Sequence, residues 1–480
     1  MYDVAIIGCG ISGAGVAYNL ARYQLSTVIL EKENDVATGT TKANSAIVHA
    51  GYDPAPGTLM ARFNVEGNRL IPKLCKEMSV PYIQNGSLVL AFDEQDIATL
   101  QKLLERGKTN GVEGLRILTG DEVRAMEPNI SAEVKAALHA PTGGIVDPWE
   151  LAIAMASVAV RNGVKLLRNS PVTGIKAIPG GYALETPQGE VQAKLVVNAA
   201  GTHADEVNNL IAKPYFSITP SKGEYQLLDK NQGSLVKHTI FQCPTPAGKG
   251  ILAAPTVHGN LITGPTAEDT ADPDDVTTTA QGLAVVEEFA HKSVPSISFR
   301  ERIRAFSGVR AHADVDDFIV EFAPDAPGFF NMAAIKSPGL TAAPAIGVHV
   351  AELLASMLSA AFNPSFDGSR KKTVFKHLSK EEKKALVARD GSFGRIICRC
   401  EGITEGEILE AIHSPIPPVS IDGVKRRCNT GMGRCQGGFC APRVHEILCR
   451  ELGCPMEEIV KDKSGSYILT GSTKAGGKQI

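Results

Sequence analysis

The hydrophobic pattern at the start of the chain alternates between strand-like and helical periods. The apolar run Val4–Ile7 leads into a glycine-rich turn at residues 8–13, and a helical pattern follows to about Arg22. A second apolar run, Thr27–Leu30, ends at Glu31. This order predicts strand, tight turn, helix and strand, which is how an α/β domain with a parallel sheet begins.

Later apolar runs suggest that this first domain is not continuous in sequence. Leu195–Val197 and Asn331–Ala334 are buried-type strands of the same kind, and mixed helical and strand-like patterns separate them. We therefore expect a nucleotide-binding domain interleaved with a second domain. The expected ranges are 1–75, 146–214 and 301–360 for the first domain, and 76–145 and 215–300 for the second.

The C-terminal quarter of the chain has a different pattern. Residues 361–395 are interpreted as a linker or docking arm with a charged helix at Lys380–Arg389. A small cysteine-rich domain follows at 396–455, and a Gly-, Ser- and Lys-rich tail at 456–480. In the small domain, Thr404 and Glu407 form a capping-box pattern before an apolar run. Another helix is expected from Pro442 to a stop at Gly453.

Composition narrows the class of protein. Hydrophobic residues make up 43% of the 480 residues and the net charge is −3, so neither nucleic acid nor anionic lipid is indicated as a partner. No apolar run approaches the roughly 20 residues that span a bilayer. The first strand begins at Tyr2, which leaves no room for a signal peptide. We expect a cytoplasmic protein, or one peripheral at the inner face of the membrane.

Seven of the ten cysteines lie between Cys398 and Cys454, which favours metal or redox chemistry over disulfides in a cytosolic chain. The spacing is C-x-C, a long spacer, then C-x-x-x-x-C, and four thiolates on two loops suit a [2Fe-2S] cluster or a zinc ion. Neighbouring cations would offset the negative charge of a cluster: Arg399, Arg427 and Arg434. The expected ligands are Cys398, Cys400, Cys435 and Cys440. Cys428 is an alternative ligand that makes a less tight loop.

The glycine-rich turn has the spacing G-x-G-x-x-G. Gly8 permits the turn, Gly10 lets the backbone approach a pyrophosphate, and Gly13 lets helix and strand pack closely. Free N–H groups at the helix N-terminus favour phosphate. Glu31 stands 18 positions after Gly13, where its carboxylate can accept hydrogen bonds from an adenosine ribose. The motif predicts a dinucleotide, and small polar segments at 40–45, 198–201 and 337–341 favour FAD over NAD.

Taken together, residues 8–13, 42–51, 198–201 and 337–341 resemble the FAD-dependent glycerol-3-phosphate dehydrogenase/oxidase group of the D-amino-acid-oxidase-like superfamily. The likeness covers about residues 1–360. It implies a Rossmann-type FAD-binding domain and a substrate domain with an antiparallel sheet over the flavin. The cofactor-binding residues that it implies are Gly8, Gly10, Ile11, Ser12, Gly13, Glu31, Lys32, Thr40, Thr41, Asn44, Ser45, Val172, Ala200, Gly201, Gly339, Leu340 and Thr341.

Oxidation of an alcohol by a flavin needs a base and groups that hold the substrate. His49 is the expected base, since an imidazole titrates near neutral pH and the resemblance places it facing the flavin; a buried structural histidine is the alternative. Arg310 is expected to bind an anion, and a surface ion pair is the alternative. Lys249 is expected to be a second cation, and a solvated side chain is the alternative. Ser45 is expected to orient the substrate, and Ser337 is expected to add a hydroxyl where the anion binds.

The segment from Cys398 to Cys440 is similar to the bacterioferritin-associated-ferredoxin-like [2Fe-2S] domain. A flavin and a cluster in one chain imply an electron relay, so we expect a dehydrogenase and not an oxidase. The family resemblance implies the substrate, a small phosphorylated polyol, sn-glycerol 3-phosphate. The expected acceptor is a flavoprotein or a quinone-linked subunit. A dehydrogenase of a 2-hydroxy acid, such as 2-hydroxyglutarate, or of an amino acid is one alternative. A non-catalytic electron-transfer or redox-sensing module is another.

Overall fold

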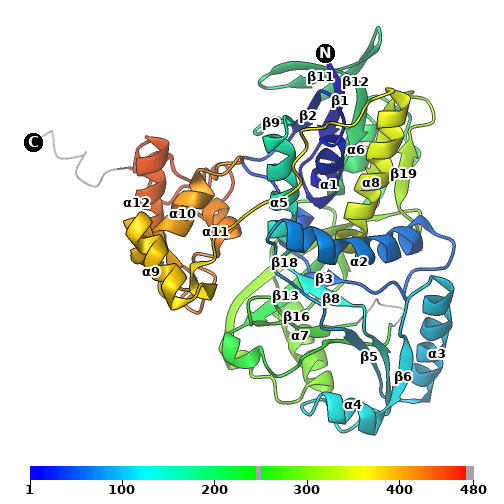
Figure 1. Ribbon diagram of the computed structural model, residues 1–480. Helices are drawn as coiled ribbons and strands as arrows, with labels where there is room; N and C mark the ends of the chain where they lie inside the picture. The colour runs from blue at the N-terminus through cyan, green and yellow to red at the C-terminus, as the bar shows by residue number, and fades with distance from the viewer. Residues whose placement is uncertain (245–249, 472–480) are drawn as a thin grey trace, which may run out of the picture. The chain divides into compact units, whose positions relative to one another are not determined.

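The computed structural model describes residues 1–244 and 250–471. The chain forms two compact units (Figure 1). The larger unit comprises residues 1–30, 37–167 and 171–370. The smaller unit comprises residues 31–36 and 168–170 and the chain from 371 onward. Two short segments that follow strands of the larger unit in sequence therefore belong to the smaller one.

One sheet of the larger unit has eight strands in the order β10-β11-β12-β1-β2-β9, with β20 beside β12 and β19 beside β20. Strands β20, β12, β1, β2 and β9 run parallel, as expected for a nucleotide-binding domain. The predicted strand, turn, helix and strand are confirmed, with the helix ending at Leu20 and not at Arg22. The strands are β1 (Tyr2–Ile7), β2 (Thr27–Leu30), β9 (Lys165–Leu167), β10 (Gly174–Ile178), β11 (Gly181–Thr186), β12 (Gly189–Asn198), β19 (Ile319–Phe322) and β20 (Phe329–Ala333).

The second sheet has nine strands in the order β17-β13-β16-β15-β14-β5-β7-β6, with β18 paired to β13. All pairs are antiparallel except β14 with β5. The strands are β5 (Ser87–Ala91), β6 (Arg116–Thr119), β7 (Ala136–Ala140), β13 (Ile218–Leu228), β14 (Thr239–Gln242), β15 (Leu252–Pro255), β16 (Leu261–Gly264), β17 (Glu268–Asp269) and β18 (Arg302–Ala313).

Strand β18 differs from the expected domain ranges, which assigned residues from 301 onward to the nucleotide-binding domain. It pairs along nearly its whole length with β13, from Ile218 opposite Ala313 to Leu228 opposite Arg302. Cross-strand pairing over this length outweighs proximity in sequence to the nucleotide-binding strands. Arg310 is therefore carried by the second sheet.

A third, small sheet joins β3 (Ile47–Val48), β8 (Gly144–Val146) and β4 (Tyr82–Ile83) in the order β3-β8-β4. In Figure 1 it lies between the two larger sheets, close to the long helix α2 (Leu59–Glu77). The other helices of this unit are α1 (Ile11–Leu20), α3 (Glu94–Thr109), α4 (Gly120–Met126), α5 (Pro148–Arg161), α6 (Ala204–Asn208), α7 (Ala280–Ser293) and α8 (Gly339–Met357), with 3₁₀ turns η1 (Thr40–Lys42), η2 (Gly201–His203), η3 (Lys230–Gln232) and η4 (Phe299–Glu301).

Helix α8 packs closely on α1 and α2, and glycines make this possible. A Cβ atom at Gly67 of α2 would lie 1.9 Å from the carbonyl oxygen of Thr341, and one at Gly347 would lie 2.6 Å from the backbone of Gly15. By length and composition alone α8 could cross a membrane, so the prediction that no apolar run is long enough is wrong. Because 61% of its apolar window is buried, a core helix explains the composition.

The smaller unit is mostly helical. Its elements are α9 (Lys380–Arg389), α10 (Glu405–Ile412), α11 (Ile421–Cys428), α12 (Ala441–Leu452), the hairpin strands β21 (Ile396–Cys398) and β22 (Ile403–Thr404), and 3₁₀ turns η5 (Phe375–His377), η6 (Gly391–Gly394) and η7 (Met456–Glu458). The predicted helix at 380–389 is confirmed, as are the capping box of Thr404 with Glu407 and the left-handed stop at Gly453. Ile408, Val424 and Leu448 form the centre of the core.

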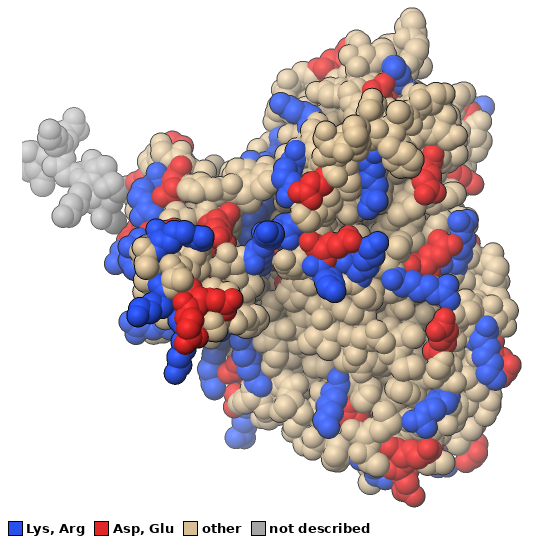
Figure 2. Space-filling model, viewed as in Figure 1, with Lys and Arg blue, Asp and Glu red and all other residues tan. Residues whose placement is uncertain are grey.

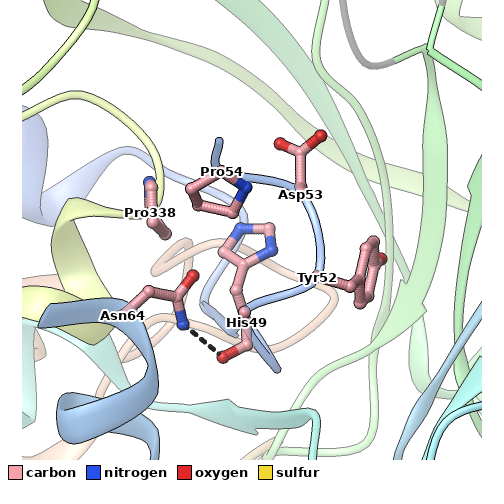
Figure 3. A pocket seen from close by; sticks show the side chains of 7 residues that line it. His49, Tyr52, Asp53, Pro54, Asn64 and Pro338 are labelled. Carbon is pink, nitrogen blue, oxygen red and sulfur yellow. Dashed lines mark hydrogen bonds between the residues drawn. The ribbon is translucent and has the colours of Figure 1, made fainter. Parts of the chain in front are cut away.

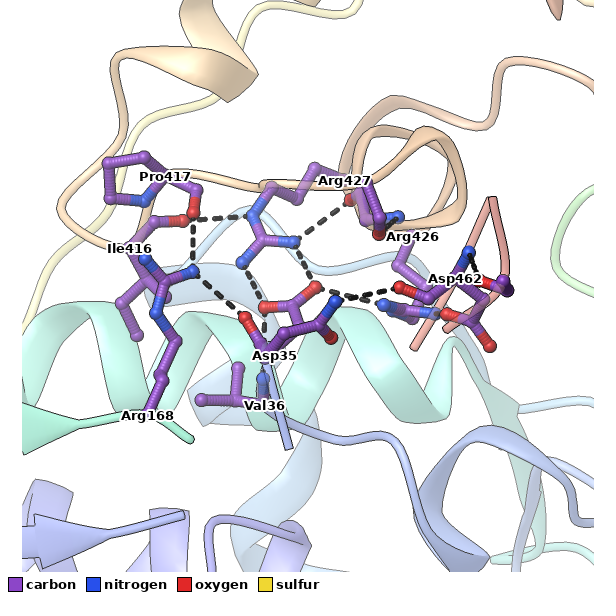
Figure 4. Close-up of polar contacts among 12 residues, drawn as sticks. Asp35, Val36, Arg168, Ile416, Pro417, Arg426, Arg427 and Asp462 are labelled. Atoms are coloured by element: carbon purple, nitrogen blue, oxygen red, sulfur yellow. Dashed lines mark hydrogen bonds and ion pairs between the residues drawn. The ribbon is translucent and has the colours of Figure 1, made fainter. Parts of the chain in front are cut away.

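A buried ion-pair network lies inside the smaller unit (Figure 4). Asp35 is fully buried and both of its carboxylate oxygens accept hydrogen bonds from Arg427 of α11. Arg426 donates to Asp35 at 3.0 Å and to Asp462 at 2.6 Å. Arg168 donates to the carbonyl oxygens of residues 34 and 417. These contacts make the segment 31–36 an integral part of this unit.

Candidate active site and candidate cluster site

The three motif glycines have different surroundings. A Cβ at Gly8, where φ is +95°, would lie 2.6 Å from the carbonyl oxygen of Ala199, and one at Gly13 would lie 2.0 Å from the carbonyl oxygen of Gly8. At Gly10 the nearest atom would be the Thr41 hydroxyl at 3.2 Å. The first and third glycines are thus required by backbone packing. The second leaves the N-terminus of α1 accessible to a ligand, as a phosphate site needs.

The loop after β2 is tied down by its own polar side chains. Thr41 accepts a hydrogen bond from the N–H of Ile11, at 2.9 Å, and the Thr40 hydroxyl donates to the carbonyl of Val309. The Asn44 side chain donates to the carbonyls of residues 40 and 41 and accepts from the N–H of Ala46. These hydrogen bonds therefore fix the backbone conformation of the residues that are expected to line the cofactor.

The remaining cofactor candidates lie on several elements. Glu31 directly follows β2, is 6% exposed, and accepts a hydrogen bond from the N–H of Glu33. Lys32 beside it is exposed, and Ser12 lies in the first turn of α1. Val172 packs against the core of the eight-stranded sheet, and Ala200 and Gly201 follow β12. The first turn of α8 contains the last three: Gly339, Leu340 and Thr341.

His49 is fixed by its backbone. Its N–H donates to the Thr341 hydroxyl at 2.9 Å, and its carbonyl accepts from the side-chain amides of Asn64 and Asn68. Its ring stacks on Phe241 with 5.8 Å between centroids, and its Nε2 lies 3.3 Å from the Ser337 hydroxyl. Three elements distant in sequence, α2, β14 and α8, therefore determine where this imidazole lies.

A shallow pocket adjoins the His49 ring (Figure 3). In that view the ring points between the labelled side chains of Asp53, Pro54 and Pro338. The lining residues are His49, Gly51, Tyr52, Asp53, Pro54, Asn64 and Pro338. A half-buried imidazole at the wall of a pocket has the position that a proton acceptor needs.

Arg310 and Ser45 meet around a residue that the sequence analysis missed, Tyr225 of β13. The Tyr225 hydroxyl lies 3.3 Å from the Ser45 hydroxyl, and its ring stacks on Phe306. Burial raises the pKa of Tyr225, whereas the nearby charge of Arg310 opposes that rise. The side chains of residues 224 and 226 form hydrogen bonds with α7 and its N-cap. Because side chains alternate between the two faces of a strand, Tyr225 lies on the opposite face, and this alternation is the signal that could have identified it.

The Arg310 guanidinium is oriented by three backbone carbonyls, those of Ser221, Lys222 and Thr266. It is half-buried, and no ion pair of Arg310 with a carboxylate is found among residues 1–244 and 250–471. Such fixed donors leave a planar cation in one orientation, suited to an anion. The second expected cation, Lys249, lies outside the described residues.

The four expected cluster ligands form two pairs in the smaller unit. Cys400 and Cys435 have their sulfur atoms 3.5 Å apart. A hydrogen bond from Cys440, together with the backbone N–H groups of Gly431 and Glu401, lowers the pKa of the Cys398 thiol. The described residues contain no set of three His, Cys, Asp or Glu side chains already gathered as around a metal ion, so the thiols are paired and do not form a closed cage.

The surroundings of these thiols fit a [2Fe-2S] cluster. A Cβ at Gly433 would lie 2.4 Å from the Cys400 Cβ, so only glycine allows the two loops to meet. Backbone N–H groups of Gly437 and Phe439 reach the Cys435 sulfur, as is common around iron–sulfur clusters. The Cys428 thiol instead donates to the carbonyl of Val424, and burial raises its pKa to about 12.

One supporting argument for the cluster is wrong. Arg427 was expected to offset cluster charge, but its guanidinium is 3% exposed and bonds to Asp35 and to two carbonyls, so that charge is already balanced. Arg399 and Arg434, beside the cysteines, are exposed. The cationic surroundings of the site therefore come from these two residues.

Comparison with known families identifies the class of protein. Residues 3–353 match the family model "FAD dependent oxidoreductase", and residues 396–450 match the "BFD-like [2Fe-2S] binding domain". The chain belongs to the FAD-dependent oxidoreductase family and carries a C-terminal BFD-like domain. Its cofactors are FAD and a [2Fe-2S] cluster, which decides against zinc, and the expected fold class is confirmed.

Individual relatives are similar over much or all of the chain. A glycerol 3-phosphate dehydrogenase of Caloramator mitchellensis is 50% identical and covers 99% of both chains. The dithionite-reduced, FAD-bound L-α-glycerophosphate oxidase of Mycoplasma pneumoniae is 31% identical with a TM-score of 0.74, covering 78% of this chain and 99% of its own. An L-2-hydroxyglutarate dehydrogenase of Escherichia coli (strain K12) is 32% identical over 56% of this chain and 64% of its own.

Proposed function

We propose that this enzyme oxidises sn-glycerol 3-phosphate to dihydroxyacetone phosphate. The observation that carries the proposal is the fixed imidazole of His49 beside the Ser337 hydroxyl. The same unit holds the Ser45 hydroxyl, beside Tyr225, and the oriented cation Arg310. A 50%-identical relative with the same length bears the name of this activity. The relatives are enzymes, which counts against a purely electron-carrying or sensing module.

The chemistry requires removal of a hydride from C2 of the substrate and a proton from its hydroxyl. FAD, when bound, accepts the hydride. His49 Nε2 takes the hydroxyl proton, and Ser337, at 3.3 Å from this atom, orients either the ring or the substrate hydroxyl. Because the His49 backbone is bonded on both sides, the imidazole is positioned before substrate arrives.

Arg310 holds the substrate phosphate. Its carbonyl partners fix Nε and one terminal nitrogen, and the planar guanidinium is the group that best matches a phosphate. Ser45, bonded to Tyr225, contributes a hydroxyl near the same strand, and Lys249 is proposed as the second cation on the basis of its sequence position.

For the cofactor, the N-terminus of α1 with Gly10, Ile11, Ser12 and Thr41 would hold the pyrophosphate. Glu31 and Lys32 would hold the adenosine ribose. The residues proposed around the rest of FAD are Gly8, Gly13, Thr40, Asn44, Ser45, Val172, Ala200, Gly201, Gly339, Leu340 and Thr341.

The cluster makes a dehydrogenase the better description than an oxidase. The proposed ligands Cys398, Cys400, Cys435 and Cys440 would hold the cluster, which would supply one-electron transfer between the flavin and an acceptor other than oxygen. The acceptor proposed is a flavoprotein or a quinone-linked subunit at the inner face of the membrane or in the cytoplasm.

Anaerobic spectroscopy tests the proposal. The visible flavin absorbance should bleach on addition of sn-glycerol 3-phosphate, and a reduced [2Fe-2S] signal should then appear in the EPR spectrum. Glycerol without phosphate and the sn-1 enantiomer are the controls. A flavin that bleaches only with non-phosphorylated acids would remove the proposal.

The second candidate is oxidation of a 2-hydroxy acid. The similarity to L-2-hydroxyglutarate dehydrogenase supports it, and Arg310 would hold a carboxylate as readily as a phosphate. L-2-hydroxyglutarate is therefore included in the same anaerobic bleaching test. The ratio of its bleaching rate to that of sn-glycerol 3-phosphate decides between the two candidate functions.

A further inference from the structure

An aromatic side chain stands exposed at the cluster loop. Phe439 is 84% exposed, the highest value among the large apolar side chains of the described residues. It lies between Cys435 and Cys440 in the second cysteine motif. An aromatic residue that remains in water, next to a redox centre, is typical of the centre of a protein interface.

The loop that carries Phe439 is thin. Residues 437 and 438 are glycines, so no side chain shields the cysteine sulfurs along this stretch, and the neighbouring Cys400 is itself exposed. The N–H of Phe439 reaches the Cys435 sulfur. A protein that packs on the Phe439 ring is therefore separated from the cluster ligands by a single layer of backbone.

Charge around the loop is positive. Arg399 lies between Cys398 and Cys400 and is exposed, as is Arg434 beside Cys435. The acidic neighbour, Glu401, is 4% exposed and lies 3.8 Å from the ammonium group of Lys376. The surface presented here is thus basic, whereas the whole chain has a net charge of −3.

We propose that Phe439, Arg399 and Arg434 form the docking surface for an acidic one-electron protein that takes electrons from the [2Fe-2S] cluster. The aromatic ring supplies buried apolar area and the arginines supply steering and orientation. In the transfer, one electron leaves the reduced cluster, the cluster returns to its oxidised state and the acceptor is reduced by one electron; no bond or proton is exchanged. This inference rests on the proposed relay.

Two haem proteins of opposite surface charge serve as probes, the acidic cytochrome b5 and the basic cytochrome c. The holoenzyme is reduced under argon either by sn-glycerol 3-phosphate or by dithionite, and excess dithionite is then removed. The reduction of the haem in each cytochrome is followed by absorbance. We expect the rate with cytochrome b5 to fall as ionic strength rises, and the rate with cytochrome c to rise, because salt screens attraction in one case and repulsion in the other.

Two variants and one control locate the surface. Arg399→Glu should lower the second-order rate constant with cytochrome b5 by roughly tenfold and flatten its salt dependence. Phe439→Ala should lower the same constant with the salt dependence unchanged. Arg389→Glu makes the same charge change at the end of α9, away from both cysteine motifs in sequence, and should have little effect. Flavin bleaching should be the same in all three, and the cluster EPR signal should be the same in Phe439→Ala and Arg389→Glu. Each rate is divided by the amount of reduced cluster that EPR measures, so that any loss of cluster in Arg399→Glu is not counted as loss of docking.

The outcomes separate this inference from the proposed function. Unchanged cytochrome b5 rates in both variants would overturn the docking surface, as would an enzyme with a reduced cluster that fails to reduce this probe. If substrate reduces the cluster more slowly in Arg399→Glu or Phe439→Ala, this surface receives electrons from the flavin, and the docking of an external acceptor there is overturned. If sedimentation shows a dimer that Phe439→Ala abolishes, a second copy of this chain covers Phe439, and the proposed docking surface is overturned. If sn-glycerol 3-phosphate does not reduce the enzyme, the proposed function fails, but the enzyme reduced by dithionite still tests the docking surface.

Discussion

The Asp35 carboxylate is held bidentately by Arg427, with 2.7 Å from Nη2 to Oδ1 and 2.8 Å from Nη1 to Oδ2. Asp35 follows the ribose-binding candidate Glu31 by four positions, and Arg427 lies in the last turn of α11, the helix before the second cysteine motif. This buried pair, together with the bond from Arg426 to Asp35, joins the segment after β2 to the helical core of the smaller unit.

Asp35→Asn should destabilise the smaller unit strongly. The amide removes the charge that balances two buried arginines, and an uncompensated buried charge costs about 3–5 kcal/mol. Differential scanning calorimetry should show the transition that includes the cluster unit move to lower temperature. Glu446→Gln, which breaks a surface pair with Arg443, is the control and should cost less than about 1 kcal/mol. Equal shifts in the two variants would contradict the assignment.

The same pair predicts a dependence of stability on pH. Arg427, through its charge and its hydrogen bonds, together with Arg426 holds the pKa of Asp35 far below its ordinary value, against the opposing effect of burial. Unfolding returns the carboxyl to a pKa of about 3.9, so the unfolded chain binds the proton first. The stabilisation is therefore complete above this value and is lost as the pH falls below it. Urea unfolding between pH 6 and pH 3 should show a smaller loss in Asp35→Asn than in the wild type.

Elements whose cause is local could be predicted from the sequence. The glycine turn, the capping box at Thr404 and the helix stop at Gly453 depend on neighbours within a few residues, and all three were predicted. Asp35 could not be recognised, because its partner Arg427 is 392 positions away and nothing nearby distinguishes a buried aspartate from a solvated one. For the same reason Arg427 was misassigned to the cluster.

The candidate site divides in the same way. His49 stood out by its residue type and by family likeness, but its partner Ser337 is 288 positions away. Tyr225 and the carbonyl partners of Arg310 come from β13, whose pairing with β18 is a tertiary choice and not a local one. Sequence therefore predicts candidate residues, and the sheet register determines which of them meet.

His49→Gln should slow flavin reduction by roughly 10²- to 10⁴-fold, because the amide cannot accept the hydroxyl proton. The backbone bonds to Thr341 and Asn64 do not involve the ring, so the loop should keep its course and FAD should stay bound. Stopped-flow absorbance under argon measures the rate. His413→Gln, an exposed histidine of the smaller unit, is the control. Reduction at the wild-type rate would exclude His49 as the base.

Two cysteine substitutions test the ligand assignment against each other. Cys435→Ser should abolish the EPR signal of the reduced cluster and leave substrate bleaching of the flavin intact. Cys428→Ser should keep the cluster signal, because that thiol donates to the carbonyl of Val424 inside the core. Iron content and EPR of both proteins provide the measurement. A cluster lost from Cys428→Ser and retained by Cys435→Ser would reverse the assignment.

Gly308→Ala tests whether close backbone contact positions the active-site loop. A Cβ at Gly308 would lie 1.9 Å from the carbonyl oxygen of Ala43, so either β18 or the loop must move. Overpacking of this kind costs typically about 1–3 kcal/mol. A displacement near 1 Å would separate Arg310 from the loop and lower kcat/KM by roughly 10²-fold. Gly391→Ala, in the 3₁₀ turn η6 of the smaller unit, is the control, because nothing lies within 4 Å of the new atom. Steady-state kinetics with sn-glycerol 3-phosphate should therefore separate the two alanines, and equal activity would show that the contact between Gly308 and Ala43 does not position the site.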